Sequence, residues 1–407
     1  MKLLVVTQYF YPENFRINDL CAELVKRGHE VTVYTGIPNY PNGFFYPGYS
    51  FIRKKKEIWN GIKIIRSPLL PRKKGKVHLI LNYFSFAFIA SLKAHFIKWE
   101  KYDVIYVFET SPITVALPAI TIKKLTGIPI IMNVQDLWPD NVVAITGWKS
   151  PLVLSPLNKL VNYIYSKCDL ILASSKSFIP NICSHGPDKA KVKFWPQFSV
   201  VQQSEKQIEL LPKESFHIMF TGNLGEAQNL ELMIEAAALC QKQSITWHLI
   251  GDGRNKDTLE QLVIKYGLQK QVLFHGRKEE QLIPEYLKSA NAALLILKPN
   301  PVFDNTIPAK LQTYLACGIP VLASVRGEAK KLIEQEHVGL TCSQQSAECL
   351  ANQAVAMSHM SKEELKKYAK NALDCSEKYF NKEQLVTQLE NYMLGVRNKT
   401  CSKIKHC

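Results

Sequence analysis

Two patterns of hydrophobic and polar positions alternate along the first half of the chain. Short runs of β-branched and other apolar residues, typical of buried strands, alternate with segments whose apolar residues recur at helical spacing. The strand-like runs lie at residues 2–10, 29–36, 102–110, 128–136 and 168–175. Between the first two, residues 15–28 have the helical pattern, and Gly28 is a good helix terminator. Buried strands that alternate with helices predict a parallel, doubly wound sheet.

The same alternation begins again in the second half of the chain. Strands are predicted at residues 216–225, 245–253, 272–277, 291–298 and 319–324, with helical patterns between them. A polar, unpatterned stretch near residues 200–215 separates the halves. The sequence therefore predicts an α/β protein with two Rossmann-like domains, at 1–205 and 206–375. A C-terminal helix and basic tail should follow at 376–407, and its last residues should be frayed.

Composition supports a packed protein of more than one domain. The chain has 407 residues, of which 46% are hydrophobic and 21% charged, which excludes disordered, collagenous and coiled-coil classes. The cysteines form no CxxC pair, so neither a zinc ribbon nor a disulfide framework is indicated, and reduced thiols are expected. The N-terminal segment has the pattern of a buried strand, not of a signal peptide. No uncharged apolar run reaches the roughly 20 residues of a membrane span, so we expect a cytoplasmic protein that at most touches the membrane.

The positive charge of the chain is concentrated in its first half. Residues 1–200 hold 26 Lys and Arg against 12 Asp and Glu, a net charge of +14, whereas the remaining residues hold 25 against 23. Such a field favours a polyanion, either nucleic acid or an anionic membrane surface. A solvated basic face with no partner is the alternative.

One stretch, residues 71–99, departs from the alternation. A basic cluster precedes a run rich in Leu, Ile and Phe that also contains Asn82 and Ser85, so the run is too polar to span a membrane. A basic cluster beside an aromatic helix suits a segment in the membrane interface. A core helix is the alternative interpretation, and the two interpretations are compatible if only one face of the helix is buried. The expected membrane residues are Arg72, Lys73, Lys74, Lys76, Phe84 and Phe88.

A candidate anion site follows the first strand of the second half. Gly222 and Gly225 lie in a turn between a strand and a helix, where free backbone N–H groups and the helix dipole attract an anion. The turn reads GNLG and not GxGxxG. Nicotinamide dinucleotide binding is therefore disfavoured, and a diphosphate remains a candidate ligand.

Six ordered blocks give the chain a resemblance to a known family. They are RGHEVTVYT, VQDLWPD, FTGNLGEAQNLELMIEAA, LIGDGRNKDTLEQL, VLFHGR and PAKLQTYLACGIPVLAS. The chain resembles the retaining glycosyltransferases of family four, which have the GT-B fold of two facing Rossmann-like domains with parallel sheets. The QDLWPD and PAKLQTYLACG segments are most similar to the branch of O-antigen and colanic-acid enzymes that includes the fucosamine transferases (WbuB-like).

The chain departs from the family pattern at three places. Two glutamates separated by seven residues usually precede the ACGxPV segment, but Asn305 and Thr313 occupy their positions. Asn223 and Gln228 stand where basic residues are common after the glycine turn. The N-terminal glycine pair is replaced by a segment that offers Glu13, Asn14 and Arg16.

The resemblance implies a nucleotide-sugar donor, UDP-linked, in the second domain. Lys310 begins a helix, where its ammonium and the helix dipole both stabilise an anion such as the departing diphosphate. A solvated first-turn lysine is the alternative, and Arg254 carries the same ambiguity. No DxD-like acidic pair is evident, so no metal is expected. The predicted donor residues are Gly222, Asn223, Arg254, Gly276, Arg277, Lys310 and Thr313, with Lys310 also catalytic.

The acceptor is expected in the first domain. Asp136 follows a hydrophobic strand, where ligands bind in open α/β sheets, and could orient or deprotonate an acceptor hydroxyl. Its alternative role is to cap the following turn. Glu109 lies at another strand end with the same ambiguity. Asp136 is the predicted catalytic residue, and the predicted acceptor contacts are Glu13, Asn14, Arg16 and Glu109.

The resemblance thus implies a retaining glycosyltransferase of bacterial surface polysaccharide synthesis. The donor sugar would be N-acetylfucosamine or another amino or deoxy sugar, and the acceptor a lipid-linked glycan. A nucleotide-sugar epimerase of the same architecture is the alternative. A nucleic-acid-binding protein is suggested only by charge, without an RNA or DNA module, and no nucleic-acid partner is expected. A catalytically inactive scaffold is a further alternative, because both motif glutamates are missing.

Overall fold

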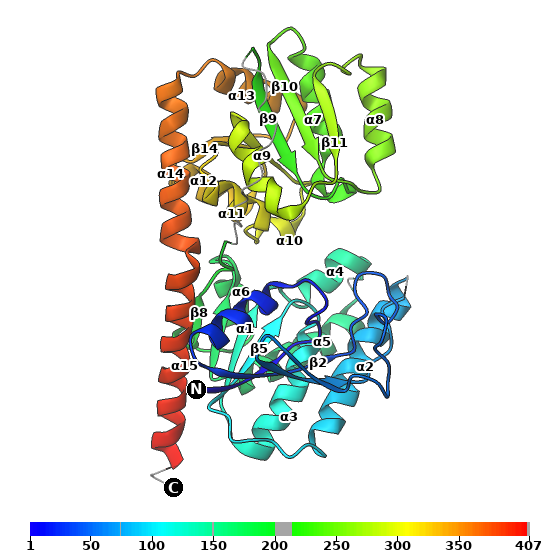
Figure 1. Cartoon of the computed structure of the whole chain (residues 1–407), viewed down its shortest axis with the longest axis vertical. Coiled ribbons are helices and arrows are strands. Elements are labelled where there is room, and N and C mark those ends of the chain that lie inside the picture. The colour runs from blue at the N-terminus through cyan, green and yellow to red at the C-terminus, as the bar shows by residue number, and fades with distance from the viewer. Residues whose placement is uncertain (74, 149, 200–213, 405–407) are drawn as a thin grey trace. The chain divides into compact units, whose positions relative to one another are not determined.

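The computed structural model describes residues 1–73, 75–148, 150–199 and 214–404. The chain forms two compact units (Figure 1), and each combines a sheet with flanking helices. The first unit comprises Met1–Pro196 together with Glu383–Cys407, and the second comprises Gln197–Lys382. The stretch expected to join two domains, near residues 200–215, falls largely outside the described residues.

The first unit contains an eight-stranded sheet with the order β3-β4-β2-β1-β5-β6-β7-β8. Its pairs are parallel except β3 with β4, which is antiparallel. The strands are β1 (Lys2–Val6), β2 (Glu30–Gly36), β3 (Lys56–Trp59), β4 (Ile62–Ser67), β5 (Val104–Glu109), β6 (Ile130–Val134), β7 (Leu170–Ala173) and β8 (Val192–Phe194). The helices are α1 (Arg16–Lys26), α2 (Lys76–Ala94), α3 (Ala116–Thr126), α4 (Asp140–Thr146), α5 (Pro151–Lys167) and α6 (Phe178–Ser184), with 3₁₀ turns at Ile113–Val115 and Lys189–Lys191.

The central strands of this sheet are buried throughout, as their apolar runs predict. Every residue of β5, β6 and β7 is buried, which is the pattern of parallel strands covered on both faces. Helix α1 ends before Gly28, whose φ of +86° is favourable for glycine and ends the helix as predicted. Strand β1 pairs with both β2 and β5. The strands that follow β1 are therefore added first on one side of it and then, from β5 on, on the other. Ligands of open α/β sheets bind beside such a switch, at the carboxyl ends of the strands.

The second unit contains a six-stranded parallel sheet with the order β11-β10-β9-β12-β13-β14. Its strands are β9 (Phe216–Thr221), β10 (Ile245–Ile250), β11 (Val272–Gly276), β12 (Ala292–Ile296), β13 (Val321–Ser324) and β14 (Gly339–Thr341). Its helices are α7 (Leu230–Leu239), α8 (Lys256–Lys265), α9 (Ile283–Ser289), α10 (Pro301–Asp304), α11 (Ala309–Ala316), α12 (Gly327–Gln335), α13 (Ala347–Ser358) and α14 (Lys362–Phe380), with 3₁₀ turns at Glu226–Gln228 and Glu280–Leu282. The switch point lies between β9 and β12. Both sheets have the α/β architecture that the sequence predicts.

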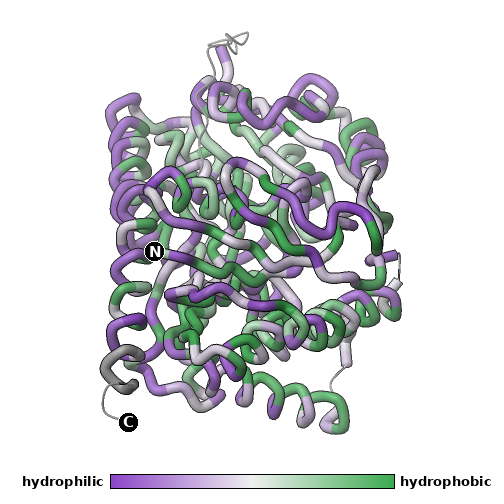
Figure 2. The backbone as a smooth tube through the Cα atoms, turned by 60° about the horizontal axis from the view of Figure 1, so that its bottom comes forward, coloured by the Kyte–Doolittle hydropathy of each residue, from purple (hydrophilic) through white to green (hydrophobic). Residues whose placement is uncertain are grey.

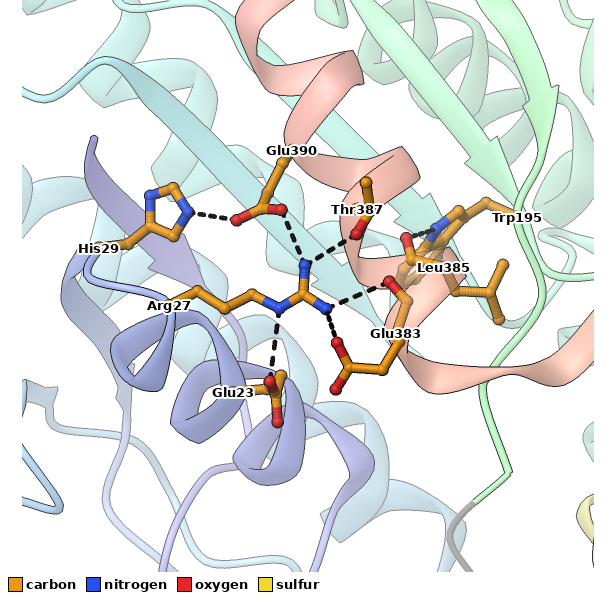
Figure 3. Close-up of polar contacts among 8 residues, drawn as sticks. All are labelled: Glu23, Arg27, His29, Trp195, Glu383, Leu385, Thr387 and Glu390. Carbon is orange, nitrogen blue, oxygen red and sulfur yellow. Dashed lines mark hydrogen bonds and ion pairs between the residues drawn. The ribbon is translucent and has the colours of Figure 1, made fainter.

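The last helix, α15 (Lys382–Ile404), belongs to the first unit. Hydrophobic and hydrophilic stretches alternate along it toward the C-terminus in Figure 2, and Leu389 and Met393 are buried. Arg27, at the end of α1, donates hydrogen bonds to Glu383, Thr387 and Glu390 of α15 (Figure 3). The sequence predicted a separate tail from residue 376, whereas the chain returns at residue 383 to the unit in which it began.

Candidate active site

The turn after β9 is built by glycines that a side chain could not replace. Gly222 has φ +130°, and a Cβ on it would lie 2.6 Å from Cε of Lys310. Gly251, with φ +148°, follows β10, and a Cβ there would lie 1.8 Å from the carbonyl oxygen of Gly222. The two turns are joined because the N–H of Gly222 donates to the carbonyl of Ile250 at 2.8 Å. Backbone therefore approaches backbone closely at the carboxyl edge of this sheet.

Lys310 extends from the first turn of α11 over this glycine turn. Its ammonium lies 3.8 Å from the centre of the Phe220 ring and donates a hydrogen bond to Oε1 of Gln228. Burial lowers the pKa of Lys310 to about 7, because the charged form loses its hydration. A bound anion would favour the charged form and draw a proton onto the amine. The position of Lys310 was predicted from the sequence, and its burial was not.

Two neighbours of Lys310 were missed as functional residues. Gln228 was noted only as a place where a basic residue is absent, yet its side-chain oxygen holds the ammonium. Phe220 was counted as one more apolar residue of the strand, yet its ring face supports the cation. The available signal for Phe220 was an aromatic residue two positions before the glycine turn.

The other predicted donor residues are dispersed along the same edge. Asn223, Arg254 and Arg277 are exposed. Gly276 ends β11 with φ +64°, and its carbonyl accepts the N–H of Gly251 at 3.0 Å. The Thr313 hydroxyl donates to the carbonyl of Ala309 at 3.2 Å, within its own helix. Donor binding by these residues stays a prediction.

Asn305 and Thr313, at the positions of the two missing family glutamates, each donate to the backbone carbonyl four residues earlier. The Asn305 amide donates to the carbonyl of Pro301 at 3.0 Å, so it serves the end of α10. The adjacent carboxylate, Asp304, lies 3.6 Å from Nε of Arg326. Gly327 is required beside it, because a Cβ there would lie 1.8 Å from the carbonyl oxygen of Asp304.

In the first unit, two carboxyl groups meet at the ends of neighbouring strands. Glu109 ends β5 and Asp136 lies just beyond β6, strands that pair in parallel with Glu109 opposite Val134. Glu109 is fully buried and accepts the N–H groups of Ser111 at 3.1 Å and Gln135 at 3.3 Å. Burial raises the pKa of Glu109 well above its ordinary value, and the Asp136 charge raises it further. Glu109 therefore holds a proton more readily than an ordinary glutamate.

Asp136 is the more accessible member of the pair. Its side chain is half-buried, and burial raises its pKa, which a hydrogen bond with the Asn141 side chain partly offsets. Its backbone N–H donates to Oε2 of Glu109 at 3.4 Å. Two adjacent buried carboxyls resist simultaneous ionisation. The arrangement allows Asp136 to exchange a proton with a ligand, while Glu109 holds the loop.

Aromatic side chains enclose this pair. The indole N–H of Trp138 donates to the Ser111 hydroxyl at 3.1 Å, and the Tyr83 hydroxyl also hydrogen-bonds to Ser111. Tyr83 belongs to the apolar stretch at residues 71–99, but it is only 8% exposed and points inward. Asn82 is fully buried beside it, where it accepts from Gln8 and donates to the carbonyl of Leu70. These bonds explain why a polar residue interrupts the apolar run.

The three predicted acceptor residues of the N-terminal segment lie in different surroundings. Glu13 is 1% exposed, and its carboxylate accepts the backbone N–H groups of Phe10, Asn39 and Tyr40. Burial raises the pKa of Glu13 to about 7. Asn14 is exposed, and Arg16 lies 4.0 Å from Asp19 of its own helix. The geometry of Glu13 is that of a loop clamp, and acceptor binding by all three stays a prediction.

The placement of Arg72 corrects its assignment to the membrane. Its guanidinium lies 5.3 Å from the ring centre of Tyr40 and 5.9 Å from that of Tyr83, and it hydrogen-bonds with the Tyr9 side chain. Arg72 therefore points into the aromatic cluster and not toward a lipid surface. A run of basic residues does not reveal which member turns inward. Lys73 is exposed, while Lys74 and the side chain of Lys76 lie outside the described residues.

Helix α2 has one buried and one exposed apolar face. Phe86, Ala90 and Ala94 are buried in the core, while Phe84 is 50% and Phe88 71% exposed. By length and composition, Val77–Ala94 could cross a membrane, yet 33% of this window is buried inside the protein. The core-helix interpretation is confirmed for the buried face, and membrane contact of the exposed face stays a prediction.

Among the described residues, no group of three or more His, Cys, Asp and Glu side chains is placed to hold a metal ion. A reaction that needs no metal stays a prediction. The histidines that lie closest together, His217, His248 and His275, hydrogen-bond to one another across neighbouring strands at 2.9 and 2.8 Å.

Comparison with known proteins places both halves of the chain among glycosyltransferases. Residues 15–198 match the model "Glycosyltransferase Family 4", and residues 201–374 match "Glycosyl transferases group 1". The putative colanic acid biosynthesis glycosyl transferase WcaI of Escherichia coli is 26% identical over 340 residues, covering 78% of this chain and 82% of that protein. The probable glycosyltransferase WbjE of Pseudomonas aeruginosa is 22% identical and covers 57% of this chain and 60% of its own.

Solved structures show the same fold at low sequence identity. Anabaena Alr3699/HepE in complex with UDP has a TM-score of 0.69 at 17% identity, covering 97% of this chain and 100% of that chain. Sucrose-phosphate synthase of Thermosynechococcus elongatus has a TM-score of 0.72 at 16% identity, covering 97% and 98%. The matches do not favour the epimerase alternative. Two glycosyltransferase domain models in succession and these neighbours establish that the chain is a glycosyltransferase with the GT-B fold.

Proposed function

We propose that the protein transfers a sugar, with retention of anomeric configuration, from a UDP-sugar to a lipid-linked glycan in bacterial surface polysaccharide synthesis. The observation that carries the proposal is the half-buried Lys310, whose ammonium lies over the Gly222 turn. The names of the relatives support the pathway, because two similar Escherichia coli proteins are described as colanic acid enzymes. Solved neighbours that contain UDP, UDP and glucose, or UDP-glucose support the donor class.

In this proposal the donor diphosphate binds at the carboxyl edge of the second sheet. Free N–H groups of the glycine turns and the first turn of α11 attract its negative charge. Lys310, whose pKa is about 7, takes up a proton as the diphosphate binds. Its ammonium then stabilises the charge that develops on the leaving diphosphate. The interaction is strong because the site is already largely desolvated.

The acceptor hydroxyl would approach the Asp136 and Glu109 pair of the first unit. Asp136 is half-exposed with a raised pKa, which suits a group that orients the hydroxyl and receives its proton. Glu109 positions Asp136 by accepting its backbone N–H. We propose no metal in the reaction, because the protonated Lys310 would itself stabilise the charge that develops on the leaving group.

The protein would work at the cytoplasmic face of the membrane, where lipid-linked glycans are met. The exposed apolar face of α2 and the neighbouring basic residue Lys73 support peripheral contact. The donor sugar would be N-acetylfucosamine or another amino or deoxy sugar, as in the branch whose motifs the chain shares.

The decisive experiment incubates the purified protein with UDP-sugars and a lipid-linked glycan acceptor. We expect sugar transfer that depends on the acceptor, with the anomeric configuration of the donor retained in the product as read by NMR. Inversion would contradict the retaining mechanism. Epimerisation or hydrolysis of the nucleotide sugar at full rate without acceptor would contradict transfer and favour the alternative activity.

A further inference from the structure

The outer face of α2 carries a continuous apolar stripe. Its residues recur every three or four positions and so lie on one side of the helix. They are between 46% and 71% exposed, unlike the buried residues of the opposite side. The stripe consists of Val77, Leu81, Phe84, Phe88 and Leu92. A soluble protein rarely leaves so many large apolar side chains together in water unless something binds them.

Beside the stripe, a groove of about 330 Å³ runs between α2, α3 and α5. These three helices are neighbours in the first unit (Figure 1). Phe84 and Phe88 of α2, Leu117 and Ile120 of α3 and Tyr163 of α5 form an apolar lining. Lys124 of α3 is one of the polar residues that line the groove. The groove therefore has an apolar lining that suits a hydrocarbon chain, and a cationic side chain among its lining residues.

Short stretches of chain connect the groove lining with the carboxyl pair. Phe84 follows Tyr83, whose hydroxyl bonds to Ser111 beside Glu109. The short turn that precedes α3 starts two residues after Ser111 and leads directly to Leu117. Phe84 of α2 and Leu117 of α3 line the groove, and each lies within a few residues of a group that contacts the candidate acceptor site. This connection favours a ligand that occupies both.

The helices that line the groove are cationic. Lysines occur on all three, and α2, α3 and α5 contain no aspartate or glutamate. The ammonium groups of Lys124 and Lys167 lie 5.8 and 5.4 Å from the ring centre of Tyr163. A negatively charged amphiphile matches this combination of apolar floor and positive surroundings.

We propose that this groove binds the hydrocarbon chain of the lipid-linked acceptor, an isoprenoid carried on a phosphate or diphosphate. The inference rests on the lipid-linked acceptor of the proposed function. The chain would lie along α2 and α3, with its phosphate end toward Tyr83 and Ser111. In this proposal α2 binds the lipid while it stays packed on the protein, because Phe86 and Ala90 on its opposite face are buried in the core.

The test measures binding of farnesyl diphosphate without vesicles and below its micelle concentration, with inorganic diphosphate as the headgroup control. We expect saturable binding of farnesyl diphosphate at least about tenfold tighter than of inorganic diphosphate, since burial of two methylenes already corresponds to about that factor. Ser91→Trp and Thr121→Trp each place an indole in the groove and should remove this advantage. Leu92→Trp is the matched control, because Leu92 belongs to the stripe and does not line the groove.

Equal affinity of wild type and both groove variants for farnesyl diphosphate would overturn the proposal. So would a stable dimer, detected by sedimentation, that Phe88→Glu dissociates, because a second copy would then cover this face. UDP affinity of the groove variants should equal that of wild type, because the proposed donor site belongs to the second unit. Unchanged circular dichroism and thermal unfolding show that the first unit of each variant is folded. If no sugar transfer is found but farnesyl diphosphate still binds in the groove, the proposed function fails, and the part of the inference that stands is a groove for an isoprenoid diphosphate.

Discussion

At the scale of single residues, Lys310 is the group whose state changes most when a donor binds. Burial holds the pKa of Lys310 near 7, so above that pH the free amine is mostly neutral and a bound diphosphate must draw in a proton. Lys310→Met keeps the apolar stem on Phe220 and removes the charge. We expect UDP affinity to fall about 10- to 100-fold, from a charge-assisted contact of about 1.5–3 kcal/mol.

Calorimetry distinguishes this role from simple packing. Above pH 7, the enthalpy of UDP binding to wild type should depend on the ionisation enthalpy of the buffer, because Lys310 takes up a proton. The dependence should vanish in Lys310→Met. Lys298→Met is the control, since Lys298 flanks the same turn but pairs with exposed Glu226 at 3.1 Å. Buffer-independent binding to wild type would show that Lys310 does not meet the diphosphate.

Asp136 should act in the reaction and not in donor binding. Burial raises the pKa of Asp136, so the ionised base appears only as the pH rises through that raised value. We therefore expect kcat to increase with pH through this range and to flatten at higher pH. Asp136→Asn should lower kcat about 100-fold or more, as expected for loss of a general base, and should leave UDP affinity unchanged. The control is Asp140→Asn, because Asp140 is exposed and bonds only to Asn181 among the contacts described. Loss of UDP affinity in Asp136→Asn would remove Asp136 from the acceptor side.

Single residues also show where prediction from the sequence stops. Gly222 and Lys310 were identified because turn chemistry and helix starts are local features of the chain. Glu13 was assigned to the acceptor and Arg72 to the membrane, yet Glu13 binds three backbone N–H groups and Arg72 lies against Tyr40 and Tyr83. Whether a polar side chain faces a ligand or the protein depends on partners distant in sequence. Periodicity contains no information on them.

At the scale of elements, the alternation of patterns predicted the strands and helices well, because burial and periodicity are fixed within each element. Helix α2 shows the limit of this approach. Its sequence is apolar around most of its circumference, so the pattern fitted both a core helix and an interfacial helix. Only packing determined that Phe86 faces the core and Phe88 faces solvent.

The basic residues Lys73, Lys74 and Lys76, which precede or begin α2, should attract it to anionic membranes. Each contributes about 1 kcal/mol near such a surface, so Lys73→Glu, Lys74→Glu and Lys76→Glu together should abolish co-sedimentation with anionic vesicles. Binding of wild type should fall as salt rises, because the Debye length shortens. A matched triple Lys→Glu variant at the exposed positions Lys362, Lys366 and Lys367 of α14 should still sediment. Equal sedimentation of the two triple variants would show that net charge, and not this segment, drives binding.

At the scale of the whole molecule, the chain leaves its first unit near residue 196 and returns to it at residue 383. The return is fixed by α15, whose backbone carbonyl at Leu385 accepts the indole N–H of Trp195 at 2.9 Å. Glu390 accepts from Arg27 at 2.9 Å and contacts His29 at 2.7 Å (Figure 3). No local pattern could predict these contacts. Arg27 and Glu390, for example, are more than 300 residues apart in sequence.

The Arg27 contacts should hold α15 on the first unit. Arg27→Met leaves Glu23, Glu383 and Glu390 without their shared cation, so we expect a loss of about 2 kcal/mol in unfolding free energy. Amide hydrogen exchange over residues 383–404 should accelerate first, because this helix then detaches before the sheet unfolds. Lys370→Met breaks an exposed pair with Asp374 and should change stability by less than about 1 kcal/mol.

The same contacts should make the attachment of α15 sensitive to acid. Burial raises the pKa of Glu390, but hydrogen bonds from His29 and Arg27 outweigh it and hold the pKa below its ordinary value. A carboxyl with a lowered pKa stabilises the fold at neutral pH, and this contribution is lost as the pH falls through the folded-state pKa. Exchange over residues 383–404 should therefore accelerate on acidification, beyond its intrinsic pH dependence, in wild type but not in Glu390→Gln. If Glu390→Gln keeps the same acid response, carboxyls elsewhere in the first unit control the attachment, and Glu390 does not.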